Sequence, residues 1–455
     1  MIVEELDGYE LGFCSRWGPR NNPNWSWRNN LVCYSEKTKL FYVALCSKIL
    51  IFERCNGDLV QQSLEIDNTD PNFDMTMSHP IFDGPGANYL TIATCGSIEY
   101  LISLTGTGRV ILRPTGNVTG SPLIFNVRHS AWSVAMAKEG PYLAIGHNGA
   151  QVTVLDISLP PGVAEIEARK LSCCGNIPCV AFSRDSKRLM AAILPSQRGT
   201  PGLAQTELGE TLINTSCPQD AYGNNWACLF LYGDDFMKNE WQPDCHALLH
   251  VPEFEDAPNY EFCFWAAEKD IYFGRFDLEW HNFSGGEWWT ETFASVDWSD
   301  ANRNIYARLN LVKHIKHLGV LVVANQFGAI RIIELCHREK RDNEADKDSI
   351  YGFRLVAVLS VRKGQGHRGE AVTDTSKIIP GQVKKDAQAW VLQGGISEAR
   401  ETNDQVLFGL DVVPNEADES AELVVFTHSS EILSWTIRRQ PIQASRIVLH
   451  RSLGR

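Results

Sequence analysis

Short apolar runs alternate with polar or glycine turns along much of this chain. Residues 131–136, 141–146 and 151–157 form three such runs in succession. Apolar runs of this length, bounded by turn residues, are typical of β-strands, and three in a row predict an antiparallel sheet. A sheet of this size is the repeating unit of a β-propeller.

A second unit follows the same layout. Residues 177–182 and 189–194 are apolar runs joined by the turn 183–188, close to the second and third strands of a WD40 repeat. A third unit ends at Trp435, where WD40 blades commonly carry a tryptophan. Counting similar units along the chain predicts an all-β, seven-bladed WD40-like β-propeller with long surface insertions, although six or eight blades would fit the pattern. The expected strands are 31–34, 40–44, 48–52, 89–94, 98–104, 109–112, 260–266, 270–276, 311–315, 319–324, 329–335, 406–413, 423–427 and 432–437.

The regular spacing favours one large domain over residues 1–455. Surface insertions are expected at 196–225, 337–349 and 362–404, where polar and turn-forming residues replace the apolar pattern. A basic C-terminal tail is expected over about 438–455. Within it, residues 446–450 are the expected extra strand that completes the last blade.

Charge and cysteine usage narrow the function. The 455 residues carry 42 Lys and Arg against 55 Asp and Glu, a net charge of -13, which disfavours direct binding of nucleic acid. Several of the 13 cysteines, such as Cys46, Cys179, Cys228 and Cys263, lie inside apolar runs rather than at disulfide-framework spacings, as in a reducing compartment. An acidic N-terminus and the lack of a long apolar run predict a soluble intracellular protein that does not enter a membrane.

Several local phrases occur in a collinear order that resembles a known family. Two of them are Asn29-Asn30-Leu31 and Asn224-Asn225-Trp226. Others lie at 129–135, 175–182, 309–313, 318–334, 407–410 and 428–435. Together they resemble the fungal WD40-like regulators of ribonucleotide reductase transcription, which are also described as substrate-adaptor subunits of a cullin ubiquitin ligase. The chain departs from that pattern at 146–149 and at an extended aromatic segment around residue 288.

The resemblance implies an adaptor in the nucleus or cytoplasm that contacts other proteins. Its partners would belong to a cullin ligase or to a transcription-regulatory assembly. It supplies no catalytic motif and identifies no binding residue, so we expect neither catalytic residues nor a cofactor.

Three groups of residues could in principle form a cofactor or metal site, and we compare that interpretation with a structural role for each. Residues 364–369 match the dinucleotide-binding spacing G-x-G-x-x-G, but no helical pattern follows, so a solvated loop is favoured. Cys173, Cys174 and Cys179 are a dense thiol group without a second pair to complete a zinc site. His314 and His317 fit ordinary polar pairing better than a metal or proton-relay role. We therefore predict no metal site.

Acidic and aromatic residues inside the strand pattern are expected to be structural. Asp156 and Asp185 lie at strand ends and in turns, where carboxylates fix the turn by accepting hydrogen bonds. Trp132, Trp226 and Trp435 lie inside apolar runs and are predicted to be buried.

The segment between Trp280 and Trp298 holds the candidate docking residues. Trp288 and Trp289 are consecutive and follow Gly285-Gly286, so in an extended segment their side chains point in opposite directions. Tryptophan is a preferred anchor of protein interfaces, and we assign Trp288 and Trp289 as candidate protein-docking residues. Packing within a blade is the alternative.

These observations predict a non-enzymatic scaffold or adaptor. The competing hypothesis is a propeller-bodied enzyme with an active site in the central channel, which would need charged or metal-ligating residues at the strand starts. The expected strand starts carry Ser, Asn, Gly and apolar residues instead.

Overall fold

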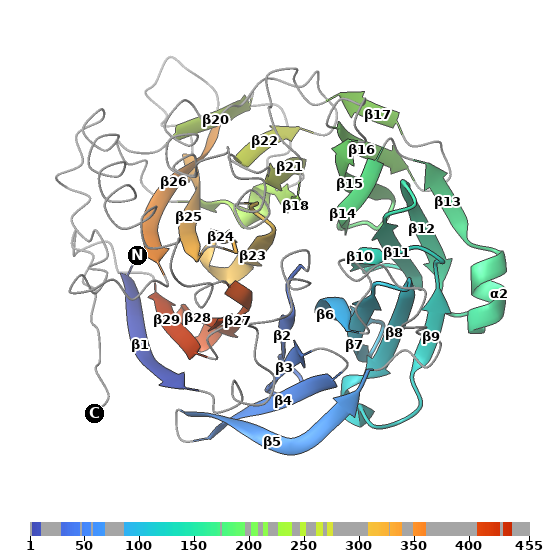
Figure 1. Cartoon of the computed structure of the whole chain (residues 1–455). Helices are drawn as coiled ribbons and strands as arrows, with labels where there is room; N and C mark the ends of the chain where they lie inside the picture. The colour runs from blue at the N-terminus through green and yellow to red at the C-terminus, as the bar shows by residue number, and fades with distance from the viewer. Residues whose placement is uncertain are drawn as a thin grey trace, which may run out of the picture. The chain divides into compact units, whose positions relative to one another are not determined.

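A computed structural model of the chain describes most of the expected strands (Figure 1). The described residues are 2–10, 29–45, 48–55, 58–68, 86–172, 175–195, 202–207, 213–216, 226–238, 246–251, 261–266, 271–275, 308–326, 328–338, 349–360, 407–427 and 431–438.

The chain divides into two compact units. The first, which we call the four-sheet unit, comprises Phe13–Phe230 and Phe408–Asp411. The second, the split unit, comprises Met1–Gly12, Leu231–Leu407 and Val412–Arg455. Each is described separately below.

The four-sheet unit contains four sheets, each made of four consecutive antiparallel strands. The sheets have the orders β2-β3-β4-β5, β6-β7-β8-β9, β10-β11-β12-β13 and β14-β15-β16-β17. Sequential antiparallel strands of this kind are the blade form of a propeller. Their bounds are Val32–Ser35, Leu40–Leu45, Lys48–Cys55, Asp58–Asp67, Ala87–Cys95, Ile98–Thr105, Arg109–Pro114, Leu123–Asn126, Ala131–Met136, Tyr142–His147, Gln151–Asp156, Arg169–Ser172, Gly175–Phe182, Arg188–Pro195, Gly202–Glu207 and Ile213–Ser216 for β2 to β17 in order.

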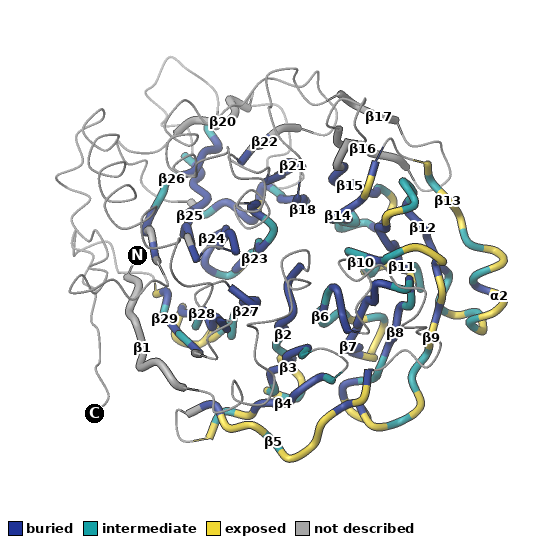
Figure 2. The backbone as a smooth tube through the Cα atoms, viewed as in Figure 1, coloured by how far each residue is buried: buried dark blue, intermediate teal, exposed yellow. Residues whose placement is uncertain are grey.

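Burial falls from the middle strands of a blade to its fourth strand (Figure 2). Tyr42 and Val43 of β3 are consecutive and both buried, because each face of the sheet packs against protein. In β5, by contrast, Val60 and Leu64 are exposed apolar side chains. The fourth strands therefore lack a continuous apolar pattern, and the sequence did not predict β5, β9 or β13.

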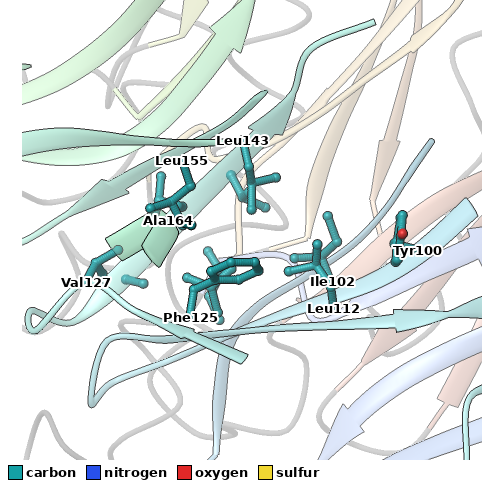
Figure 3. Packing of buried hydrophobic residues seen from close by; sticks show 13 residues of the cluster. Tyr100, Ile102, Leu112, Phe125, Val127, Leu143, Leu155 and Ala164 are labelled. Atoms are coloured by element: carbon teal, nitrogen blue, oxygen red, sulfur yellow. The ribbon is translucent and has the colours of Figure 1, made fainter. Parts of the chain in front are cut away.

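One core cluster fills the space between the second and third sheets (Figure 3). Ile102, Leu112 and Phe125 come from the second sheet, and Leu143 and Leu155 come from the third. All five are fully buried, so adjacent blades are held together by apolar side chains from facing sheets. A second cluster repeats this packing between the third and fourth sheets.

A short helix, α2 (Pro161–Ile166), covers the edge of the second sheet. Proline at the first helical position suits its fixed backbone angle and missing N–H. Ala164 of the helix joins the core, and Glu165 accepts a hydrogen bond from the backbone N–H of Asn126 on β9, 2.6 Å away. The helix thereby pairs one backbone donor of an otherwise open sheet edge.

The remaining sheets lie mainly in the split unit, although the residues of β18 up to Phe230 and the segment Phe408–Asp411 of β27 belong to the four-sheet unit. One has the order β1-β29-β28-β27, a second has β20-β26-β25-β24-β23 with β19 beside β25, and a third has β18-β21-β22. The bounds are Ile2–Glu10 for β1, Ala227–Tyr232 for β18, Met237–Lys238 for β19, His246–Val251 for β20, Glu261–Ala266 for β21, Ile271–Arg275 for β22, Leu311–Ile315 for β23, Val320–Ala324 for β24, Ala329–Arg338 for β25, Ser349–Ser360 for β26, Leu407–Asn415 for β27, Ser420–Thr427 for β28 and Glu431–Arg438 for β29.

The extra strand of the last blade comes from the N-terminus. Strand β1 pairs antiparallel with β29, with Val3 opposite Ile437 and Glu5 opposite Trp435. The expectation placed residues 446–450 in this role, and those residues lie outside the described part of the chain. The N-terminal run alternates acidic and apolar residues, which is compatible with a strand but gave no turn signal to mark it.

Two further expectations are corrected. The segment 196–225 holds β16 and β17. Strand β16 pairs with β15, and β17 pairs with β16, so the segment contains the two outer strands of a blade rather than only a surface insertion. Among the described residues, five sheets have the regular four-stranded form, where seven regular blades were expected. The all-β propeller class is supported. The insertion 362–404 and the tail beyond Arg438 lie outside the described residues.

Candidate functional site

The first strands of three neighbouring blades share an irregularity near their beginning. In the four-sheet unit, the pairing register shifts between Ala87 and Tyr89 on β6, and between Ala131 and Ser133 on β10. On β14 it shifts between Asn176 and Cys179. Bulges of this kind turn backbone groups away from the sheet, where other segments can bind them.

Asn29, just before β2, binds the residues at all three irregularities. Its side-chain amide donates to the carbonyl oxygen of Trp132 at 2.7 Å and to that of Pro178 at 3.2 Å. Its backbone N–H donates to the carbonyl oxygen of Asn88 at 2.9 Å. One buried residue thus joins the first strands of four blades.

Asn88 extends this network. Its side-chain amide donates to the hydroxyl of Ser130 at 3.0 Å and to the carbonyl oxygen of Ala131 at 3.1 Å, immediately before and at the start of β10. We call Asn29, Asn30, Asn88, Ser130 and Trp132 the strand-start cluster.

The Asn30 side chain forms the pair of hydrogen bonds with Leu410 that a neighbouring strand would form. Its amide donates to the carbonyl oxygen of Leu410 at 2.9 Å, and its oxygen accepts from the N–H of Leu410 at 3.0 Å. A Cβ atom on the neighbouring Gly409 would lie 2.4 Å from that same oxygen, so this close approach requires glycine. Asp411 continues the contact by accepting from the N–H of Tyr34 at 2.8 Å.

The strand-start cluster consists of neutral amides, one hydroxyl and an indole. Such groups hold backbone segments in place and offer hydrogen bonds, but none of them titrates near neutral pH. What this arrangement supports is positioning of the described starts of the first strands, and the ends of strands are where β-proteins commonly present binding residues.

A buried carboxylate joins the first two blades. One oxygen of Glu99 accepts from the hydroxyl of Ser35 at 2.5 Å and from the hydroxyl of Thr115 at 2.7 Å. The Ser35 hydroxyl also accepts from the N–H of Thr38 at 3.0 Å, which fixes the turn after β2. Because all three side chains are buried, the hydrogen bonds compensate the cost of removing them from water.

His147 fixes the turn between β11 and β12. Its Nδ1 accepts from the N–H of Gly149 at 3.1 Å, so Nε2 carries the proton and donates to the Thr153 hydroxyl at 3.0 Å. Its ring stacks on the exposed His129 ring at 5.3 Å. Burial, together with the charges of His129 and Lys170, lowers the pKa of His147 to about 4.

The turn roles predicted for the two acidic residues are confirmed. Asp156 accepts from the N–H and the hydroxyl of Ser158, at 3.0 and 2.6 Å. Asp185 accepts from the Ser183 hydroxyl at 2.6 Å and from the N–H of Lys187 at 3.1 Å. Burial raises the pKa of Asp185, but these hydrogen bonds and the nearby cations outweigh it, so the pKa is lowered.

The tryptophan prediction is confirmed for two of three residues. Trp226 and Trp435 are buried. Trp132 is only half-buried, because it lies at the bulge of β10 and not within its regular ladder.

The predicted docking residues Trp288 and Trp289 lie outside the described residues, as do the glycine loop 364–369 and Cys173-Cys174. The structure brings Cys179 next to Cys228, and the Nε2–H of His317 donates to the carbonyl oxygen of Ser420 at 2.8 Å. No group of three or more His, Cys, Asp or Glu side chains suited to a metal ion occurs among the described residues.

Sequence reasoning missed the roles of Asn29, Asn88 and Glu99. Asn29 was noted in a local phrase, but its partners lie more than a hundred residues away, so no local pattern reports them. Glu99 is the second residue of an otherwise largely apolar strand, and a charged residue in such a run is a signal visible in the sequence. Charged residues are rarely buried unless they are paired, so this position predicts a buried partner.

No family model matches the sequence. The chain is similar to an uncharacterized WD repeat-containing protein of Schizosaccharomyces pombe, with 25% identity over 142 residues. That match covers 29% of this chain and 28% of the relative, so it spans less than a third of either protein. The blade-type sheets support an all-β propeller, and the match is to a protein described by its WD repeats.

None of the helices in the described part of the chain is long and apolar enough to cross a membrane.

Proposed function

We propose that this protein is a non-enzymatic scaffold that binds other proteins. The observation that carries the proposal is the set of four-stranded blades, considered with the similarity to a WD repeat-containing protein. Propellers of that type present their loops as docking surfaces. The strand-start cluster supports this role, because it joins the starts of β2, β6 and β10 through neutral hydrogen bonds.

We further propose that the chain forms a single propeller domain. Strands β23 to β26 are themselves a four-strand antiparallel meander, to which β20 adds a strand. This sheet and the β18-β21-β22 sheet differ from the regular four-stranded form but would belong to the same domain.

The finer role that we propose is that of an adaptor in the nucleus or cytoplasm, serving a cullin ubiquitin ligase or a transcription-regulatory assembly. It rests on the collinear phrases that resemble the fungal regulator family. Trp288 and Trp289 are the proposed anchors, because consecutive side chains of an extended segment point in opposite directions, so that one indole would face a partner while the other packs inward.

The test is a comparison of partners recovered by affinity purification and mass spectrometry. The full chain would be compared with the double variant Trp288→Ala, Trp289→Ala, and with Trp298→Ala as a matched control from the same aromatic segment. We expect the double variant to lose specific partners, with binding weakened by about 2 kcal/mol or more, while its circular dichroism and Tm match the wild type.

Two outcomes would overturn parts of the proposal. An unchanged partner set in a folded double variant removes the docking role of the two tryptophans. A wild-type purification without specific protein partners, and without cullin or transcription components, removes the adaptor role itself.

A further inference from the structure

Two cysteine thiols from different blades lie side by side in the four-sheet unit. Cys179 belongs to β14 and Cys228 to the start of β18, 49 residues later in the chain. The Cys179 thiol donates to the carbonyl oxygen of Cys228 at 3.5 Å, so its sulfur atom lies against the Cys228 residue. A disulfide needs the two Cα atoms to lie about 4.4 to 6.8 Å apart, and a contact between one thiol and the backbone of the other cysteine is compatible with that range.

The two thiols differ in access. Cys179 is half-buried, whereas Cys228 is only 5% exposed. The Cys228 thiol also donates to the carbonyl oxygen of Met190 on β15, at 3.9 Å. This contact keeps the Cys228 side chain turned into the protein. A small oxidant from solvent therefore meets Cys179 first.

The environment of Cys179 favours its reactive form. The interaction with the Cys228 side chain lowers the pKa of Cys179, although burial raises it. The thiolate is the form of cysteine that attacks peroxides and disulfides, so a lowered pKa increases the reactive fraction at neutral pH.

We propose that Cys179 and Cys228 are an oxidisable dithiol, which hydrogen peroxide converts to a disulfide that links β14 to β18. This inference does not depend on the proposed scaffold function.

The reaction balances in two steps. The Cys179 thiolate attacks one peroxide oxygen, the O–O bond breaks, and hydroxide leaves, which gives a sulfenic acid on Cys179. The Cys228 sulfur then attacks the Cys179 sulfur, the S–O bond breaks, and the hydroxyl leaves as water with the proton of Cys228. Two thiols are oxidised and one peroxide is reduced. A dithiol reductant reverses the change by thiol–disulfide exchange.

The disulfide has a consequence for stability. It closes a loop between two blades, which restricts the unfolded chain more than the folded one. We expect the oxidised protein to show a higher Tm than the reduced protein, and to return to the original Tm after reduction.

The experiment treats the purified full chain with hydrogen peroxide, blocks remaining thiols by alkylation, and maps disulfides in a non-reducing digest by mass spectrometry. The expected product is a peptide pair joined through Cys179 and Cys228. Cys179→Ser and Cys228→Ala should each abolish that product, while Cys55→Ser should retain it, because Cys55 is an exposed cysteine on β4. Alanine is used at the buried position to avoid introducing an unpaired hydroxyl.

A second measurement does not depend on oxidation. A trivalent arsenical such as phenylarsine oxide binds two neighbouring thiols together, so it should protect Cys179 and Cys228 from alkylation in the wild type but not protect the remaining thiol in either single variant. Peroxide treatment that joins Cys179 to a different cysteine, or that leaves both thiols alkylatable while the arsenical gives no protection, would overturn the proposal.

Discussion

The side-chain amide of Asn29 donates to the carbonyl oxygen of Trp132, 2.7 Å away and 103 residues further along the chain. Trp132 lies at a bulge, so its carbonyl is turned out of the β10 ladder and needs another donor. Asn29 supplies that donor and also binds the corresponding carbonyl of Pro178. The positions of two blade starts thus depend on one amide group.

Removing that amide should destabilise the fold. Asn29→Ala leaves two buried carbonyl oxygens without this donor, and we expect the free energy of unfolding to fall by about 1 to 3 kcal/mol. Urea denaturation monitored by tryptophan fluorescence measures the change. Asn117→Ala, at an exposed position in the same unit, is the control and should be near neutral. If the two variants had the same free energy of unfolding, the hydrogen bonds of the Asn29 side chain would make no net contribution to stability.

The carboxylate of Glu99 provides the second prediction. Glu99→Ala removes the shared acceptor of the Ser35 and Thr115 hydroxyls, and we expect a loss of about 3 kcal/mol because two buried donors lose their partner. Glu99→Gln keeps one acceptor oxygen and should cost clearly less. Glu65→Ala serves as the control, because Glu65 forms a surface ion pair with Lys48 that should contribute little to the free energy of unfolding. A Glu99→Ala variant as stable as the control contradicts the prediction.

Gly146 provides a steric prediction. A Cβ atom at this position would lie 2.5 Å from the Ser133 hydroxyl oxygen and 2.6 Å from the carbonyl oxygen of Ile177. Gly146→Ala should therefore push β11 away from β14 and cost about 1 to 3 kcal/mol. Gly116→Ala is matched in chemistry but meets no atom within 4 Å, so its Tm should stay close to that of the wild type. Similar Tm values for both variants would indicate that the blades adjust without strain.

His147 predicts a dependence of stability on pH. Its pKa is lowered from 6.5 to about 4 in the folded protein, so between these values the unfolded chain binds more protons than the folded one. Stability should therefore fall as pH decreases from about 6.5 toward 4, and one pKa unit corresponds to about 1.4 kcal/mol. The contribution is fully present above pH 6.5 and is lost below about 4.

His147→Gln checks this assignment, since glutamine does not titrate. We expect the free energy of unfolding of the variant to change less steeply across that pH window than that of the wild type, measured by urea denaturation at several pH values. His129→Gln, at the exposed ring that stacks on His147, is the control and should keep most of the wild-type slope. Identical slopes for the His147 variant and the wild type would argue against a buried neutral histidine.

The last prediction concerns the outer strands of the fourth blade. Replacing residues 202–216 by a short Gly-Ser linker removes β17 and β16, and β16 is the strand that pairs with β15 from Arg188 to Ile193. The exposed edge of β15 should then lower Tm and promote aggregation. Replacing 362–404 in the same way should leave cooperative unfolding intact, because that segment carries no periodic apolar face. Cooperative unfolding at the wild-type Tm after the first replacement would show that the two outer strands are dispensable.

The sequence predicted the inner strands of the blades well and the outer strands poorly. Residues 131–136 and 189–194 were expected as strands and match β10 and β15 closely, because both faces of such strands are buried and their apolar pattern is continuous. Three of the four residues of β13 are exposed, so its sequence predicts a polar loop rather than a strand. Its assignment depends on pairing with β12, which no local pattern encodes.

The same reason limits prediction of the candidate site. Asp185 and its turn partners lie within four residues of one another, so a local pattern could identify the turn. Asn30 and Leu410 are separated by 380 residues, and their contact becomes visible only when the chain is folded. Interactions that join blades are by nature long-range, and they are the ones that local patterns leave out.

The pairing of β1 with β29 sets an order on folding during synthesis. Residues 2–10 leave the ribosome before all the other described residues, yet the strand with which they pair is the last one described in the chain. This segment must therefore wait, unpaired, until residues 431–438 have been made, and contacts between such distant segments are slow to form. A chaperone that shields this first segment from other strand edges would have the longest time to act on it.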